Sequence, residues 1–228
     1  MSGILSQPLL WPILFLFVAG LVCLLIPKAA EKFRALFAIV SSAIALSFFW
    51  QIFRVVHSLP RGQVLLSTCP TWLNFRIDAL AGFVLVAIAA FGFLIALFSY
   101  SYQRGKTGQG EYYAILLWTV ALACGAVASN HLLVLLIFWG LLGVALYAMI
   151  SIDNPGASAA AKKSFIIIGG SDSLLLMGIL LAWHLTGSWR MTAIHLPLQG
   201  ELAYVAFFCF IIAAFAKAGA MPFHTWVP

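Results

Sequence analysis

The feature that most constrains the fold is a series of apolar stretches, each about 20 residues long, separated by short polar segments. A helix of about that length crosses a hydrocarbon core of roughly 30 Å. Seven such stretches occur, at about 8–26, 33–56, 78–100, 112–128, 132–150, 163–186 and 202–222. With 64% hydrophobic and 8% charged residues, the chain is unlike a water-soluble domain. The predicted fold class is therefore all-α, a polytopic membrane protein with about seven transmembrane helices. The polar stretch 57–76 is expected to hold a small hairpin or an interfacial helix.

The last apolar stretch predicts a broken helix. Lys217 lies in an otherwise apolar run, and Gly219, Pro222 and His224 follow it. Because proline lacks an N–H and crowds the carbonyl four residues back, we expect a helix break at Gly219 and Pro222 that leaves a carbonyl near Ala218 without its usual partner. A cation in hydrocarbon beside broken backbone is a functional candidate. The alternative is a lysine that reaches the interface from a helix end.

One acidic residue is predicted to lie deep in the membrane. Asp172 follows Lys163 by nine positions, or ~13 Å of helix, which places it close to the bilayer centre. Its segment reads G-G-S-D-S, and we expect the two glycines, residues 169–170, to allow close helix approach. We interpret Asp172 and Lys217 as opposite charges on adjacent spans, so that an ion arriving at Asp172 weakens the pair and acts on the proton of Lys217. The alternative is a protonated Asp172 hydrogen-bonded between helices.

Basic residues favour one set of loops. The loops after the first, third and fifth stretches carry Lys28, Lys32, Arg34, Arg104, Lys106, Lys162 and Lys163, whereas the opposite side carries Arg61, Arg76 and Arg190, with Arg54 near a helix end. The positive-inside rule then predicts an N-terminus outside, and we expect a multi-pass protein of the inner (cytoplasmic) cell membrane. The net charge of +6 is interpreted as this topology signal, so no nucleic-acid partner is expected.

The cysteines and histidines lack the spacing of metal sites. The four cysteines are far apart with no C-x-x-C pair, and the histidines fall in loops or near helix ends. No glycine-rich phosphate loop or nucleophile triad occurs either. We therefore expect no metal, no cofactor and no catalytic site in this chain.

The C-terminal segment K-A-G-A-M-P-F-H-T-W-V-P resembles the signature K-[SA]-x-x-x-P-x-H-x-W-L-P of a known family. This family comprises the antiporter-like, proton-conducting membrane subunits of respiratory complex I, Mrp-type antiporters and energy-converting membrane-bound hydrogenases. The segments F-R-I-D-A-L, F-S-Y-S-Y and A-A-K-K-S-F-I-I-I-G-G-S-D, starting at residues 75, 98 and 160, are also similar to family segments. The resemblance covers residues 75–228 well and the first two helices only by hydropathy.

The resemblance implies roles for individual residues. Lys217 corresponds to the central lysine of the broken seventh helix, and Pro222 and His224 to the break and its exit. Asp172 matches an acidic position found in some members. One departure stands out, because the family has W-E in the fifth helix and this chain has Gly140 in place of that glutamate. Gly140 and Gly143 then predict a close-packing face, and Asp172 is the acid expected to take over the pairing.

The resemblance also implies a larger assembly. Family members continue with an eighth helix and a second, inverted five-helix unit, so we expect a split gene in which a separate chain supplies those helices, or else a half-built path. We predict a division into residues 1–76, a helix pair with an extracytoplasmic loop, and residues 77–228, an incomplete antiporter-like unit with the helix that leads into it. The expected partners are other membrane subunits and the lipid bilayer.

Two functions remain open from the sequence. In the first, the chain conducts H⁺ or Na⁺ through Lys217 and Asp172 as a subunit of a complex I-like dehydrogenase, a membrane-bound hydrogenase or an Mrp-like antiporter. In the second, it is a non-conducting structural subunit that bridges partner subunits, as the loss of glutamate at Gly140 would allow. An isolated channel or carrier is disfavoured by the half-built path.

Overall fold

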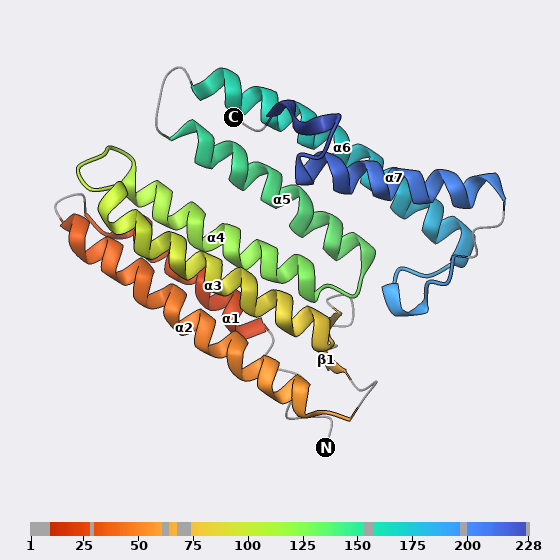
Figure 1. Ribbon diagram of the computed structural model, residues 1–228, viewed down its shortest axis with the longest axis horizontal. Coiled ribbons are helices and arrows are strands. Elements are labelled where there is room, and N and C mark those ends of the chain that lie inside the picture. The colour runs from red at the N-terminus through yellow and green to blue at the C-terminus, as the bar shows by residue number, and fades with distance from the viewer. Residues whose placement is uncertain are drawn as a thin grey trace. The chain divides into compact units, whose positions relative to one another are not determined.

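The computed structural model describes residues 10–27, 30–60, 64–67, 74–152, 157–196 and 200–226, most of them helical (Figure 1). The chain divides into two compact units, Met1–Ser129 (unit 1) and Asn130–Pro228 (unit 2). This division follows compactness alone. The boundary expected after residue 76 rests on the family resemblance and stays a prediction.

Unit 1 is a four-helix bundle with a small hairpin. Its elements are α1 (Leu10–Leu25), α2 (Glu31–Ser58), β1 (Leu65–Ser67), β2 (Phe75–Ile77), α3 (Ala79–Tyr102) and α4 (Gln109–Ala128). Helix α2 packs along α3, and α1 packs along α4. The antiparallel pair β1–β2, in which Leu65 faces Ile77, confirms the hairpin alternative for the polar stretch. A further bridge between Phe75 and Ser129 holds the hairpin against the end of α4.

A close approach at Gly20 explains why α1 packs so tightly on α4. A Cβ atom at Gly20 would lie only 2.3 Å from Nε1 of Trp118, so only glycine leaves room for this indole. The indole N–H instead donates to the carbonyl of Phe17 at 3.0 Å. The tryptophan therefore packs against α1 with its polar atom satisfied, as burial in an apolar bundle requires.

The start of α3 depends on an aspartate. Asp78 has extended backbone and accepts a hydrogen bond from the N–H of Ala81 at 2.8 Å, which is the geometry of a helix N-cap. Its carboxylate also lies 3.6 Å from the guanidinium of Arg76. The aspartate of the segment F-R-I-D-A-L thus begins the third span.

Unit 2 has three long helices, with α6 between the other two. Its elements are α5 (Leu132–Ser151), α6 (Ala157–Thr186), the 3₁₀ turn η2 (Met191–Ala193), α7 (Glu201–Ala218) and the 3₁₀ turn η3 (Phe223–Trp226). Helix α6 packs against both α5 and α7, and η3 folds back onto α6 and α7 (Figure 1). The buried core of this unit consists of Leu132, Leu175, Ile179, Ala182 and Ala213.

The described helices carry the apolar surface of a membrane protein. Six of them are long and apolar enough to span a bilayer, and α1 is a shorter apolar helix of 16 residues. Large apolar side chains face outward along these helices, among them Leu25 (81% exposed) and Ile166 (71%). The predicted all-α, multi-pass fold class is confirmed, and α6 begins several residues earlier than expected, at Ala157.

Candidate ion-translocation site

The candidate site lies in unit 2, where α5, α6 and α7 meet around Lys217. The ammonium of Lys217 donates a hydrogen bond to the carbonyl of Trp139 and lies 4.7 Å from the centre of its ring. Oδ1 of Asp172 lies 3.9 Å from Nζ of Lys217, and both side chains are less than a fifth exposed, at 18% for Lys217 and 19% for Asp172. The two charged residues that the sequence places deep in the membrane are therefore neighbours.

The position of Asp172 on its helix fixes the level of the pair. Asp172 lies at the midpoint of α6, which runs from Ala157 to Thr186. At 1.5 Å per residue, each half of that helix is longer than half of a hydrocarbon core of about 30 Å. If α6 spans the membrane, the pair is thus far from both ends of α6. The side chain of Lys217 extends from the last turn of α7 toward α5 and α6.

The ammonium of Lys217 and the carboxylate of Asp172 attract each other but are too far apart to form a hydrogen bond. At about 4 Å, opposite charges attract by roughly 4 kcal/mol at an effective dielectric constant of about 20, and desolvation offsets much of this. The 3.9 Å distance exceeds that of a hydrogen bond, and among the described residues Oδ1 of Asp172 has no hydrogen-bond partner. This oxygen can therefore accept a proton or ligate a small cation without first breaking a bond.

The end of α7 lies next to this pair. Helix α7 ends at Ala218, and Gly219 adopts the left-handed conformation with φ 65°. The N–H of Gly219 donates to the carbonyl of Ala216, and that of Ala220 to Phe215, which together form a Schellman motif. Of the two residues expected at the break, Gly219 is the one that ends α7, and Pro222 lies three residues further on, in the turn that follows.

Two side chains from η3 and α6 complete this end. The indole N–H of Trp226 donates to the carbonyl of Ala216 at 2.8 Å, and the hydroxyl of Ser164 on α6 donates to the carbonyl of Trp226 at 3.2 Å. A helix that ends in hydrocarbon needs partners for its last carbonyl groups, and Trp226 supplies one of them. Pro222 lies in the connecting turn, where the N–H of Phe223 bonds to the carbonyl of Ala220.

The two glycines of α5 have different surroundings. A Cβ atom at Gly143 would lie 3.7 Å from Oδ2 of Asp172 and 4.0 Å from Nζ of Lys217, so this residue directly faces the pair. A Cβ atom at Gly140 would meet none of the described residues within 4 Å. Among the described residues no helix packs closely on Gly140 or on the glycines at 169 and 170 of α6, so close packing at these positions stays a prediction.

Other sequence candidates lie outside the pair. His224 is exposed on η3, and the described residues show no bond between it and Lys217 or Asp172. Sequence reasoning did not find Trp139, whose carbonyl and ring both contact Lys217. The one feature of the sequence that pointed to Trp139 was its position directly before Gly140, where the family has its glutamate. The role of Trp226 had a signal too, since it is the tryptophan of the C-terminal signature.

Known sequences place this site in a family context. Residues 129–228 match the family described as NADH:quinone oxidoreductase/Mrp antiporter, TM. Among curated proteins, the chloroplastic NAD(P)H-quinone oxidoreductase subunit 5 of Angiopteris evecta is 29% identical, over 92% of this chain and 30% of the relative. The chain therefore spans about a third of the length of such a relative. The resemblance to antiporter-like membrane subunits is confirmed.

Solved structures share the fold. A chain of the Mrp complex from Dietzia sp. DQ12-45-1b superposes with a TM-score of 0.82 at 18% identity, covering 96% of this chain and 25% of that one. A chain of respiratory complex I from Thermus thermophilus with bound NADH gives 0.79 at 21% identity, covering 96% and 46%. At these identities the likeness concerns the fold alone, and the fold is that of antiporter-like subunits.

Proposed function

We propose that the chain is an ion-translocating membrane subunit of a multisubunit complex, in which H⁺ or Na⁺ passes through Lys217 and Asp172. The observation that carries this proposal is the 3.9 Å separation of the Lys217 ammonium, 18% exposed, from the Asp172 carboxylate, 19% exposed, at the midpoint of α6. Ionisable groups inside a membrane protein are costly to keep and mark ion paths. The relatives support the setting, because one is named a quinone oxidoreductase subunit and another comes from an Mrp complex.

The transport step follows from the attraction between the two charges. While Asp172 is ionised it stabilises the charged form of Lys217. A proton or Na⁺ that binds the carboxylate removes that stabilisation, so the ammonium is driven to release its proton or to move away. When the ion leaves Asp172, the attraction returns and resets the pair. While the pair is formed, the carbonyl and the ring of Trp139 hold the amine beside Asp172.

The helix end beside Lys217 provides a polar route out of the site. Beyond Ala218 the chain turns through Gly219 and Pro222 into η3, which carries the exposed His224. Backbone that leaves a helix inside a membrane is tolerated where it lines a cavity or is covered by protein. In our proposal His224 exchanges protons between this segment and the aqueous side.

The proposed assembly resembles a complex I-like dehydrogenase, a membrane-bound hydrogenase or an Mrp-like antiporter. We propose other membrane subunits as partners and place the chain in the inner (cytoplasmic) membrane with its N-terminus outside. The separate chain that would supply further helices stays a prediction. It is tested by purifying the complex and sequencing its subunits, and a polypeptide that carries both halves would contradict it.

The deciding experiment measures ion flux in proteoliposomes that contain the purified complex. Lys217→Ala should abolish coupled H⁺ or Na⁺ movement, since no other amine lies beside Asp172 in the described residues. Lys163→Ala, which removes an exposed lysine near the start of the same α6, is the matched control and should leave flux unchanged. Normal flux in an intact Lys217→Ala complex would overturn the proposal.

A structural role is the second candidate function, and the glycine at position 140 favours it. The family glutamate is absent there, and the space beside Gly140 is open among the described residues. In that case the chain bridges partner subunits and conducts nothing. Lys217→Ala would then leave flux unchanged, while deletion of the whole chain would dissociate the complex.

A further inference from the structure

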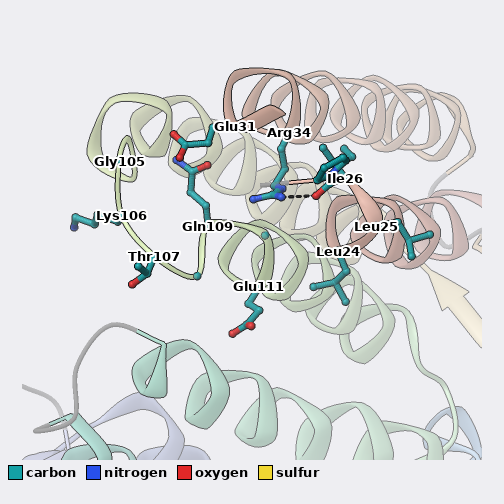
Figure 2. Close-up of a pocket in the computed structure, with 13 residues that line it drawn as sticks. Leu24, Leu25, Ile26, Glu31, Arg34, Gly105, Lys106, Thr107, Gln109 and Glu111 are labelled. Atoms are coloured by element: carbon teal, nitrogen blue, oxygen red, sulfur yellow. Dashed lines mark hydrogen bonds between the residues drawn. The ribbon is translucent and has the colours of Figure 1, made fainter. Parts of the chain in front are cut away.

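A second polar site lies in unit 1, at the ends of four helices and apart from the Lys217 pair. It is a cavity of about 470 Å³ bounded by the end of α1, the start of α2 and the loop from α3 to α4 (Figure 2). Its lining combines apolar residues of α1 with Arg34 and with the segment G-K-T-G-Q-G-E, residues 105–111. Neither the sequence motifs nor the proposed ion path uses this cavity.

Arg34 is the buried charge of this cavity. It is only 4% exposed, and Nη2 of its guanidinium donates to the carbonyl of Ile26. Its Nε–H is buried and has no hydrogen-bond partner among the described residues. Figure 2 shows the guanidinium directed into the space between Ile26 and Gln109. A buried cationic donor without a partner is costly, which points to an anion that binds here.

The first turn of α4 adds further donors on the same side. Helix α4 begins at Gln109, after Gly108 in the left-handed conformation with φ 78°. The first N–H groups of a helix have no partner within it and carry partial positive charge, so they favour an anion. A Cβ atom at Gly110 would lie 3.2 Å from Cζ of Arg34, so glycine is what lets the guanidinium lie against this turn.

The other charged residues of the lining indicate which chemical groups the ligand carries. Lys106 lies on the loop with its ammonium 3.5 Å from the ring centre of Tyr102, and Glu31 and Glu111 also line the cavity. Two cations and two carboxylates suit a ligand that has a phosphate next to hydrogen-bond donors. Such a ligand satisfies the cations through its phosphate oxygens and the carboxylates through an ammonium or hydroxyl group.

The apolar wall identifies the source of that phosphate. Leu24 and Leu25, which are 43% and 81% exposed, form one side of the cavity at the end of α1. Because the cavity is bounded by the ends of apolar helices, it opens where a bilayer would have its headgroups. A free phosphate ion makes no favourable contact with this apolar surface, whereas the acyl chains of a phospholipid would pack against it and cover it.

We infer that this cavity binds the headgroup of a membrane phospholipid. Arg34 and the first turn of α4 bind its phosphodiester, Lys106 adds positive charge at the rim of the cavity, and Glu31 and Glu111 accept from the ammonium or hydroxyl groups of the headgroup. The lipid joins the α1–α2 connection to the α3–α4 loop and thereby stabilises unit 1.

The test measures phospholipids bound to the intact complex. The complex is purified in detergent, stripped of lipid, and supplied with phosphatidylethanolamine, phosphatidylglycerol or inorganic phosphate, and binding is followed by native mass spectrometry and melting temperature. One of the lipids should bind to the wild type and raise the melting temperature, and phosphate alone should do neither. Arg34→Gln should weaken lipid binding about tenfold or more, because it removes a charged hydrogen bond.

Two further variants keep the test decisive. Lys106→Gln lies on a surface loop and should weaken binding a few-fold even if Arg34→Gln does not fold. Arg104→Gln removes an exposed charge from the same loop outside the cavity lining, and it should bind lipid like the wild type. Equal lipid binding by wild type, Arg34→Gln and Lys106→Gln would overturn the inference, as would protection by inorganic phosphate equal to that by lipid. Ion flux is not the readout, so this result is independent of the proposed transport.

Discussion

Lys217 in unit 2 and Arg34 in unit 1 are both cations withdrawn from water, but their surroundings differ in kind. Lys217 lies beside a carboxylate, an aromatic ring and a backbone carbonyl, at the level of the midpoint of α6. Arg34 lies near the start of α2, contacts one carbonyl and keeps a buried N–H without a protein partner among the described residues. Arg34 is 4% exposed and the side chain of Lys217 18%, so both are largely shielded from water.

The difference shows that two properties distinguish the roles of these cations: their position along the helix, and whether a negatively charged side chain lies beside them. A lysine with a carboxylate beside it can lose or regain a proton as that carboxylate changes state, because the ammonium deprotonates far more easily than a guanidinium. An arginine keeps its charge and presents a rigid fork of donors that suits a phosphate. The first arrangement suits transport, and the second suits anchoring.

The largest effect is expected when the Lys217 and Arg34 variants are each assayed for both ion flux and phospholipid binding. Lys217→Ala should lower ion flux on the order of a hundredfold, the scale for loss of a proton-transfer group, and should leave phospholipid binding unchanged. Arg34→Gln should do the reverse, with flux within about twofold of the wild type once unit 1 is folded. Both variants are assayed for flux in proteoliposomes and for bound lipid by native mass spectrometry. If either variant affected both properties strongly, the two cations would not have separate roles.

The next effect concerns the partner of Lys217. Asp172→Asn should impair transport nearly as much as Lys217→Ala, and the double variant should add little, since both residues act in one step. Flux of the four proteins in the double-mutant cycle measures this coupling. Asp78→Asn is a control, because it changes a helix N-cap in unit 1 and not an ion pair in the path. Losses that simply add would show that Asp172 and Lys217 act separately.

A smaller effect is expected from one methyl group on α5. Gly143→Ala places a Cβ atom 3.4 Å from Ile168 and 3.7 Å from Asp172, an ordinary contact that narrows the space around the pair. We expect a few-fold loss of flux without loss of stability. Gly140→Ala is the matched control on the same helix, because its Cβ would meet none of the described residues within 4 Å. Equal effects of the two substitutions would contradict the idea that only Gly143 faces the site.

The smallest effect concerns a third group, which lies outside the spans. His131, between α4 and α5, stacks on Trp189 at 6.2 Å, and its Nδ1 is buried without a partner among the described residues. Burial, with Arg190 nearby, holds the pKa of His131 below its ordinary value of 6.5. The unfolded chain therefore binds more protons near and below pH 6.5, so the stability contributed by this contact is present above that pH and is lost as the pH falls.

The measurement for His131 is the melting temperature of the complex between pH 7.5 and 5. The wild type should lose stability as the pH falls through the ordinary pKa of histidine, and His131→Phe should flatten that loss. His195→Phe changes an exposed histidine and should leave the pH dependence as it is. Unlike Lys217 and Arg34, His131 would then respond to pH without any ligand or ion.

Much of the fold was predictable because hydropathy is a local property. The apolar stretches gave the helix positions to within a few residues, apart from the early start of α6, and two deep charges of opposite sign were enough to predict their pairing. For the end of α7, the sequence named Gly219 and Pro222 without deciding between them, since the proline rule says how far a helix can extend and not where it stops. Gly219 ends α7 first because glycine adopts a positive φ without strain.

The contacts of Trp139 and Arg34 were also beyond sequence reasoning. A backbone carbonyl such as that of Trp139 is present in every residue, so its hydrogen bond to Lys217 leaves no mark in the residue types. Arg34 counted only as a loop charge in the topology argument. Its burial depends on how α1, α2 and the glycine at 110 come together, and that is a tertiary property.

The tryptophan that covers the end of α7 has one more consequence. Its acceptor, the carbonyl of Ala216, belongs to the residue directly before Lys217, and its segment is attached to α6 only through the hydroxyl of Ser164 in the described hydrogen bonds. If residues 223–226 moved away, the carbonyl of Ala216 would lose the indole N–H and keep only the N–H of Gly219 as a partner. The position of this turn therefore decides whether an oxygen at the end of α7 is covered or available, while α7 keeps its own hydrogen bonds.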